Sequence, residues 1–340
     1  MKKLVCLLVA LCLTAALFSC TDNPKTKQEE VKKPSVTETP VSDFEYEVVK
    51  EENRVAITKY IGTSKNVVIP SEIEGLPVTA FEITYNADGT TEKGAFEGSD
   101  VETVVLGENM RIIGSCAFKD CKELRSVTFP KSTKIVAYKT FENCTKLEIV
   151  DLSDTQLFRI DYYAFKGCTA LREVKLPECI EEICKEAFYN CTALEKIPFP
   201  ESLRLIEDGA FFNCVSLKSI NIPTQLELFT DMQTVFCHNY SLETITFDEG
   251  RESIEGYAFF SLNRIHVNED LKIIIPKSVK KLSFYTFFAY GPANLVFLGN
   301  CPEVFDETDY CSYFTISYNP NMEGWEDCTW KDKYTLIPLE

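Results

Sequence analysis

In the stretch Ala187-Phe188-Tyr189-Asn190-Cys191-Thr192-Ala193-Leu194-Glu195-Lys196-Ile197-Pro198-Phe199-Pro200, a phenylalanine is followed by a cysteine, a leucine and a short alternating apolar run that ends in proline. Close variants of this stretch recur along most of the chain. Such self-similarity is the signature of a repeat architecture. The aligned phenylalanines, called plug phenylalanines below, are separated by 22 to 28 residues and are Phe96, Phe118, Phe141, Phe165, Phe188, Phe211, Phe236, Phe259 and Phe287.

The alternating run predicts one short strand per repeat. In Ile220-Asn221-Ile222-Pro223, the first and third side chains face inward and the proline ends the strand. The Ala-Phe segment predicts a short helical or 3-10 turn whose phenylalanine fills the centre of the coil. One repeat cannot bury its apolar face alone, so we expect the repeats to stack about 4.8 Å apart as a solenoid.

The repeat Ala-Phe-x-x-Cys-x-x-Leu-x-x-Ile-x-Ile-Pro resembles that of the BspA-like leucine-rich repeat family of bacterial cell-surface proteins, over residues 43–340. This resemblance implies a leucine-rich repeat solenoid, with one short strand and one short helical or 3-10 turn per repeat of about 23 residues, an N-terminal β-hairpin cap and a C-terminal β cap. Family members are implicated in adhesion and in binding host proteins, so the resemblance implies a binding role without naming the ligand.

The expected organisation follows from these patterns. Phe44–Val49 and Arg54–Tyr60 flank a turn at Glu52-Asn53, which predicts a hairpin that pairs onto Val67–Pro70. Trp325 and Trp330 are expected to cover the core of the last repeat. The predicted segments are a signal peptide (1–19), a lipidated cysteine with a disordered tether (20–42), an N-terminal cap (43–70), the leucine-rich repeats (71–298) and a C-terminal cap (299–340).

The first twenty residues indicate export. Lys2 and Lys3 precede an apolar run, Leu4–Phe18, that is too short to span a bilayer comfortably. Leu17-Phe18-Ser19-Cys20 resembles a bacterial lipobox, which predicts that Cys20 is acylated and that the chain is held at a membrane by acyl chains alone. An ordinary signal peptide that contains a cysteine is the alternative. We expect an exported, membrane-anchored lipoprotein at the outer membrane or cell surface of a diderm bacterium.

Composition excludes several classes of function. The chain has 52 acidic and 35 basic residues, and its net charge of −17 argues against nucleic acid as a partner. The histidines are His238 and His266, and no Cys-x-x-Cys pair, nucleophile motif or phosphate-binding loop occurs. We therefore expect no enzymatic activity, no cofactor and no metal.

Five of the fifteen cysteines occupy one position in consecutive repeats, with an asparagine in the sixth repeat. Parallel Cβ vectors suit a disulfide poorly, so we expect buried thiols, with disulfide or metal use as the alternative. We call this set the cysteine ladder: Cys121, Cys144, Cys168, Cys191, Cys214 and Asn239. In the terminal region, disulfides remain open for Cys301, Cys311 and Cys328.

Two columns of side chains are candidate binding surfaces. The first consists of the outward middle residues of the strands: Val105, Thr128, Asp151, Lys175, Pro198, Asn221, Thr246, Ile274 and Phe297. The second follows the plug phenylalanines: Tyr189, Phe212, Cys237, Phe260 and Phe288. These aromatic side chains either form an exposed strip or pack against the neighbouring repeat. The leading predicted function is adhesion to host or neighbouring-cell proteins. A surface glycan-binding accessory protein and a purely structural envelope protein are the alternatives.

Overall fold

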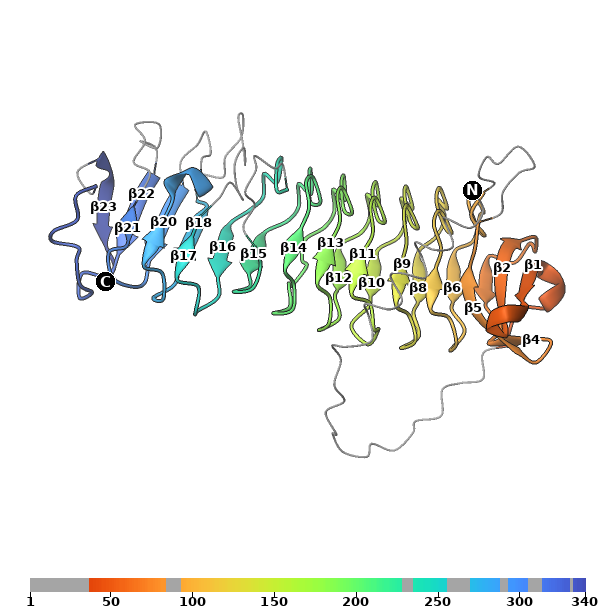
Figure 1. The fold of residues 1–340 in the computed structure, drawn as a ribbon. Coiled ribbons are helices and arrows are strands. Elements are labelled where there is room, and N and C mark those ends of the chain that lie inside the picture. Colours follow the sequence, from red (N-terminus) through yellow and green to blue (C-terminus); the bar gives the residue numbers. More distant parts are fainter. Residues whose placement is uncertain are drawn as a thin grey trace. The chain divides into compact units, whose positions relative to one another are not determined.

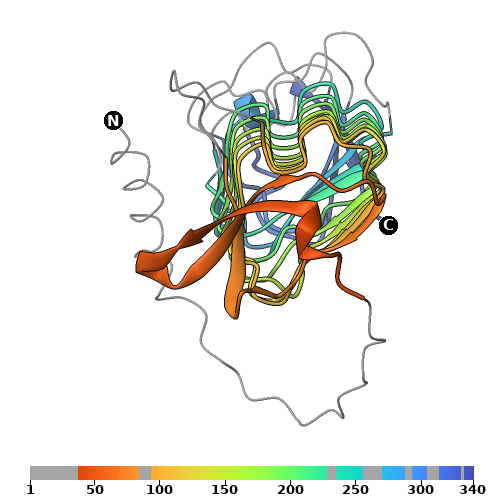
Figure 2. The same cartoon turned by 90° about the vertical axis from the view of Figure 1, so that its right-hand side faces the viewer.

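The computed structural model describes residues 37–83, 93–227, 235–255, 270–287, 293–304, 314–330 and 333–340. Nearly all of them belong to one unit, Thr39–Glu340, whose turns are stacked along a single axis (Figure 1). Viewed along that axis, successive turns superimpose (Figure 2). The signal peptide, Cys20, Phe259, Phe260, Phe288, His266 and Cys311 lie outside the described residues, so the predictions made for them stay predictions.

The alternating runs form a first row of parallel strands, one in each described turn with a single exception. Val104, for example, pairs with Val67 of the preceding turn and Val127 of the next. The strand predicted at Ile197-Pro198-Phe199-Pro200 was wrong, because Pro198 has no N–H to donate and only Lys196 forms an isolated bridge, to Glu173. The row is divided into three sheets. Its strands are β3 (Asn66–Val68), β6 (Thr103–Val105), β8 (Ser126–Thr128), β10 (Ile149–Asp151), β12 (Glu173–Lys175), β15 (Ser219–Ile222), β16 (Thr244–Phe247), β18 (Lys272–Ile275), β20 (Ala293–Phe297), β22 (Phe314–Tyr318) and β23 (Thr335–Pro338).

A second row of mostly two-residue strands lies between the first row and the plug, and the repeat pattern did not predict it. Its strands also pair in parallel along the stack, as Ile160 does with Val136. They are β5 (Leu76–Phe81), β7 (Ile112–Ile113), β9 (Ile135–Val136), β11 (Arg159–Ile160), β13 (Glu182–Ile183), β14 (Leu205–Ile206), β17 (Ser253–Ile254), β19 (Lys281–Leu282) and β21 (Glu303–Val304).

The segments around the plug phenylalanines are hydrogen-bonded turns. Among the described plug turns, a 3-10 helix is assigned only at η3 (Phe284–Phe287). The turns are tied to one another along the stack, because the N–H of Phe165 donates to the carbonyl oxygen of Ala187 at 2.8 Å, and equivalent bonds recur. Successive backbone N–H groups of the plug turn therefore alternate between acceptors in the next repeat and acceptors within the same turn, as those of Phe165 and Lys166 do.

The N-terminal hairpin pairs with a different strand from the one predicted. β1 (Phe44–Val49) and β2 (Arg54–Tyr60) are antiparallel, joined by η2 (Lys50–Glu52), and β2 pairs in parallel with β5. The prediction that the hairpin pairs onto Val67–Pro70 was wrong. The hairpin extends the second row, whereas β3 meets Thr39, which exchanges two 2.9 Å hydrogen bonds with the backbone of Val68. The 3-10 helix η1 (Val41–Asp43) and the antiparallel strand β4 (Glu72–Ile73) complete this end.

At the other end, β22 and β23 continue the first row in parallel, and the two tryptophans are buried beside them. The indole N–H of Trp325 donates to the carbonyl oxygen of Gly299 at 3.1 Å, and that of Trp330 donates to Pro302 at 3.4 Å. Their rings pack edge-on against Phe297 and Phe284. Because both ring systems are buried, they do not offer open faces to a ligand.

Candidate binding surfaces

The outward column of the first strand row is polar in its described middle. Thr128, Asp151 and Lys175 are exposed, whereas Asn221, Thr246 and Ile274 are half-buried. Lys175 pairs with Asp151 across neighbouring turns at 2.8 Å, and the Thr246 hydroxyl donates to the Asn221 side-chain oxygen at 2.6 Å. These side chains are therefore bonded to their neighbours along the column. Because exposed ion pairs stabilise proteins little, the column remains available to a partner.

Phe297 does not belong to this column, and its prediction as a surface residue was wrong. Its side chain is 1% exposed, and Phe297 pairs with Ile275, while the neighbour of Ile274 is Val296. The strand reads Leu295-Val296-Phe297-Leu298 with no proline to fix its register. Since side chains alternate between faces, an error of one residue moves the chosen side chain from solvent to core. Phe297 instead contacts Trp325, with ring centroids 5.3 Å apart.

The second predicted column divides into half-buried and buried residues. Tyr189 and Phe212 are half-buried and lie face to face, with ring centroids 4.8 Å apart and ring planes 2° from parallel. Cys237 is buried. His238 lies two residues after the next plug, Phe236, and its ring centroid is 4.7 Å from that of Phe212. Tyr189 and Phe212 therefore begin a row of rings that continues across the turns.

Sequence reasoning missed the residues that extend this row toward the N-terminus. Four of them precede the plugs Phe141 and Phe165 by two or three positions, where the repeat pattern sets no preferred residue type, and a fifth, Lys166, directly follows Phe165. Lys166 lies over the ring of Tyr189 at 4.6 Å and over that of Tyr163 at 5.0 Å. We call the whole set the aromatic strip: Tyr138, Lys139, Tyr162, Tyr163, Lys166, Tyr189, Phe212 and His238. Aligning the positions just before each plug, as well as just after it, would have found it.

In each turn from the plug Phe118 to the plug Phe211, two residues have left-handed backbone conformations. The position two residues after the plug has an asparagine, aspartate, glycine or histidine, residues for which this conformation is common, as at Asn190 with a φ of 63°. The position two residues before the plug is less suited, because Lys139 and Tyr163 have φ values of 57° and 60°. Gly209 holds the same position in another turn with a φ of 66°. The strip therefore contains side chains at positions where the backbone favours glycine.

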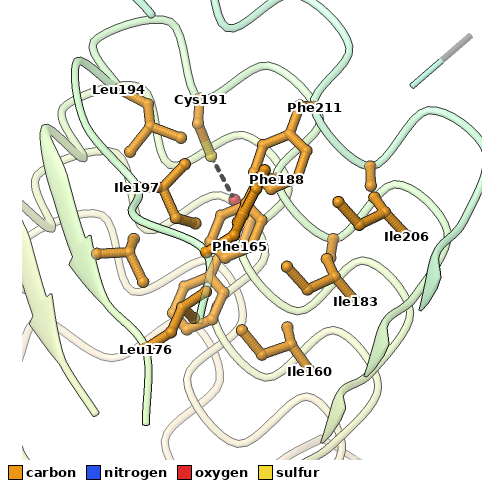
Figure 3. Packing of buried hydrophobic residues seen from close by; sticks show 14 of the residues in the cluster. Ile160, Phe165, Leu176, Ile183, Phe188, Cys191, Leu194, Ile197, Ile206 and Phe211 are labelled. Atoms are coloured by element: carbon orange, nitrogen blue, oxygen red, sulfur yellow. Dashed lines mark hydrogen bonds between the residues drawn. The ribbon is translucent and has the colours of Figure 1, made fainter. Parts of the chain in front are cut away.

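The five cysteines of the cysteine ladder are buried, and each donates a hydrogen bond to a plug carbonyl oxygen of the preceding turn. In Figure 3, the Sγ of Cys191 meets the carbonyl oxygen of Phe165 beside the stacked plug rings. The five S···O distances run from 2.9 to 3.3 Å. Burial raises the pKa of the Cys121 thiol to about 11 and raises those of the other four as well. These thiols are therefore poor nucleophiles and poor metal ligands.

Asn239 and the terminal cysteines occupy less regular positions. Asn239 is buried, and its side-chain amide has no hydrogen-bond partner within the part of the chain that is described. Cys301 is half-buried and Cys328 is buried. Cys311 lies outside the described residues, so a disulfide that involves it stays a prediction.

Within the described ranges, no group of three or more His, Cys, Asp or Glu side chains is placed to hold a metal ion. No helix among the same residues has the length and apolar character needed to cross a membrane.

With this geometry established, comparison with known families is decisive. A family model described as "BspA type Leucine rich repeat region" matches six copies of the repeat, at residues 89–183 and 159–294. The chain belongs to this family. No curated protein shows significant sequence similarity to it.

Solved structures show what this BspA-type chain is similar to. A leucine rich cell surface protein from Faecalibacterium prausnitzii A2-165 has 18% identity and a TM-score of 0.54, with 90% of this chain and 95% of the other covered. This likeness supports the solenoid fold. A leucine-rich repeat protein from Bacteroides ovatus has 20% identity and a TM-score of 0.47, covering 88% and 77% of the two chains. A Leucine Rich Repeat protein of T. pallidum, TpLRR, has 25% identity and a TM-score of 0.41, covering 62% and 86%.

Proposed function

We propose that this BspA-type protein is a lipid-anchored surface protein that binds other proteins through the aromatic strip of its solenoid. The observation that carries the proposal is the continuous row of partly exposed rings from Tyr138 to His238, which spans five successive plug turns. Tyrosine and other aromatic side chains dominate the binding energy of protein interfaces, since they are large, rigid and able to donate hydrogen bonds.

Membrane anchoring rests on the N-terminal sequence. The proposed lipid-bearing residue is Cys20, and residues 21–38 form a polar tether that keeps the repeats away from the bilayer. The tether predicted over residues 20–42 ends earlier, because Thr39 already bonds to Val68 and Val41–Asp43 is a 3-10 helix. Without Lys2 and Lys3 of the signal peptide, the net charge is near −19, so anionic lipid surfaces repel the body of the protein. We place the mature protein outside the inner membrane, with its binding surface free to meet host or neighbouring-cell proteins.

Anchoring has a direct test. In cells that are given an alkyne-labelled fatty acid, the wild-type chain should carry the label and sediment with membranes, whereas Cys20→Ser should do neither. Protease added to intact cells should degrade the repeats if they face outward. Label on Cys20→Ser would refute the assignment of Cys20, and full protease resistance would refute surface exposure.

The glycan-binding alternative needs open ring faces, because sugars pack flat on aromatic rings. In the middle of the strip the faces of Tyr189 and Phe212 cover one another, and Lys166 lies on Tyr189. Ring edges and hydroxyl groups are left for a ligand, and these suit protein side chains better.

Binding is tested with the full-length protein on one array of extracellular-matrix proteins and one array of glycans. We expect protein ligands, and we expect the double variant Tyr189→Ser/Phe212→Ser to lose them. The control Lys59→Ala changes an exposed side chain of the N-terminal hairpin, outside both candidate columns, and should keep them. Binding to glycans alone would favour the accessory role in glycan capture, and binding to neither would favour a structural envelope protein.

A further inference from the structure

The exposed end of the aromatic strip consists of two tyrosines at equivalent positions in adjacent turns. Tyr138 and Tyr162 each lie three residues before a plug phenylalanine and are 41% and 39% exposed. Among the described phenylalanines, tyrosines and tryptophans, they have the largest exposed fractions. Both are therefore accessible to a ligand that runs along the stack.

Cations already lie on the rings of this surface. The ammonium of Lys139 is 5.2 Å from the ring centroid of Tyr138 and 5.5 Å from that of Tyr163. Lys166 bridges Tyr163 and Tyr189 in the same way, at 5.0 and 4.6 Å. A cation within about 6 Å of a ring centroid is attracted by the negative potential of the ring face. The strip is thus a surface whose rings the chain itself pairs with ammonium groups.

The exposed ring of Tyr162 also lies in a negative field. Glu207, two turns further along the stack, raises the pKa of the Tyr162 hydroxyl above its ordinary value, and partial burial adds to the shift. The carboxylate of Glu207 is held in place, because it accepts a 2.8 Å hydrogen bond from the backbone N–H of Lys185. An incoming cation would find both an aromatic face and a fixed carboxylate. The net charge of −17 adds long-range attraction for basic partners.

We propose that the aromatic strip docks a basic segment of a partner protein, with arginine or lysine side chains on Tyr138 and Tyr162 and near the carboxylate of Glu207. This inference rests on the proposed protein-binding function and narrows it to a partner chemistry. An extended basic segment that follows the stack meets a new aromatic side chain at every turn. An acidic partner would meet the repulsion of the whole body.

The experiment measures binding of fluorescein-labelled octa-arginine, octa-lysine and octa-glutamate peptides to the full-length protein by fluorescence anisotropy at 150 mM salt. We expect both basic peptides to bind and octa-glutamate not to bind. The double variant Tyr138→Ser/Tyr162→Ser, which leaves the net charge unchanged, should weaken octa-arginine binding about tenfold, as loss of two cation–π contacts predicts. Tyr46→Ser is the matched control, because Tyr46 also lies beside a carboxylate, that of Glu74, but at the N-terminal hairpin. It should bind as the wild type does.

Tyr163→Gly keeps the test decisive if the serine variants unfold. Glycine suits the left-handed backbone, so this variant should keep the melting temperature and still bind octa-arginine more weakly. Cys116→Gly changes the same backbone position, where φ is 57°, outside the strip and should retain binding. Equal octa-arginine affinity of the strip variants and the wild type would overturn the proposal, because attraction would then depend on net charge alone. If that happened while the wild-type protein still bound matrix proteins, only the basic partner would be refuted. A wild-type protein that bound neither the peptides nor any matrix protein would refute the proposed function too.

Discussion

The thiol of Cys191 donates a hydrogen bond to the carbonyl oxygen of Phe165, 3.2 Å away in the preceding turn. The same relationship links each cysteine of the ladder to a plug phenylalanine 25 to 27 residues before it. The carbonyl oxygen of Phe165 also accepts the backbone N–H of Cys168, in its own turn, at 3.1 Å. The thiol of Cys191 is therefore a second donor to an oxygen that can accept two hydrogen bonds. Cysteine combines this donor with a small apolar side chain that fills the core, which explains why the position recurs.

The hydrogen bond should be measurable in the middle of the ladder. Cys168→Val keeps an apolar side chain of similar size but leaves the carbonyl oxygen of Phe141 with the backbone N–H of Cys144 as its donor, and we expect it to lower the free energy of unfolding by about 0.5–1.5 kcal/mol. Cys168→Ser keeps a hydrogen-bond donor and should lower the free energy of unfolding by less. Urea unfolding of the two variants gives the comparison. A valine variant as stable as the wild type, with serine the weaker of the two, would show that the thiol acts by packing alone.

The ladder also predicts a loss of stability at alkaline pH. The raised thiol pKa values mean that the folded state keeps protons that the unfolded state releases above the ordinary value of 9.0. Each thiol therefore makes its full contribution to the free energy of unfolding below pH 9. That contribution falls as the pH rises toward the pKa of the thiol in the folded state, which is about 11 for Cys121. The slope is up to about 1.4 kcal/mol per pH unit for each thiol. Urea unfolding between pH 8 and 10.5 should show this decline, and a variant with serine at Cys144, Cys168 and Cys191 should show a shallower one. Equal pH slopes for the wild type and the serine variant would show that the ladder thiols do not cause the decline.

Sequence alone predicted the features that repeat. The recurring phenylalanine and cysteine specify the solenoid, because stacking equivalent side chains is the one way for each repeat to bury its apolar face. The second strand row was missed, since two-residue strands such as Ile112–Ile113 are too short to show alternation. The hairpin was assigned to the wrong strand, because the sequence of β2 does not encode which of two rows it extends.

The aromatic strip was found only in part, for a different reason. Tyr189 and Phe212 follow plug phenylalanines directly, so aligning the plugs in the sequence was enough to find them. Tyr138 and Tyr163 fall where each repeat has a different residue, and only the stacked structure shows that they adjoin Lys139 and Lys166. Surface sites on a solenoid are built from the positions that vary, and a repeat pattern carries no information about these.

Left-handed residues after the plug should tolerate glycine and reject alanine. Asn190 has a φ of 63°, and its side-chain oxygen accepts a 2.5 Å hydrogen bond from the side chain of Asn213 in the next turn. Asn190→Ala should lower the free energy of unfolding by about 1–2 kcal/mol, because alanine strains this backbone and removes the bond. Asn190→Gly should lose only the bond. Thermal melting of both distinguishes strain from hydrogen bonding, and identical losses would show that the backbone conformation has no part in the effect.

A plug phenylalanine from the middle of the stack should matter to its neighbours as well as to its own turn. Phe165 is fully buried, with its ring 5.2 Å from those of both Phe141 and Phe188. Phe165→Ala leaves a cavity between two rings that cannot close without breaking the regular spacing, so we expect a loss of about 3–5 kcal/mol in the free energy of unfolding. Because each turn contacts mainly its neighbours, amide hydrogen exchange should quicken first in the turns of Phe141 and Phe188 and least in the hairpin Phe44–Tyr60. The control Phe129→Ala removes a half-buried ring and should have a smaller, local effect. Uniformly faster exchange along the whole chain would mean that the solenoid unfolds as one unit, contrary to nearest-neighbour stacking.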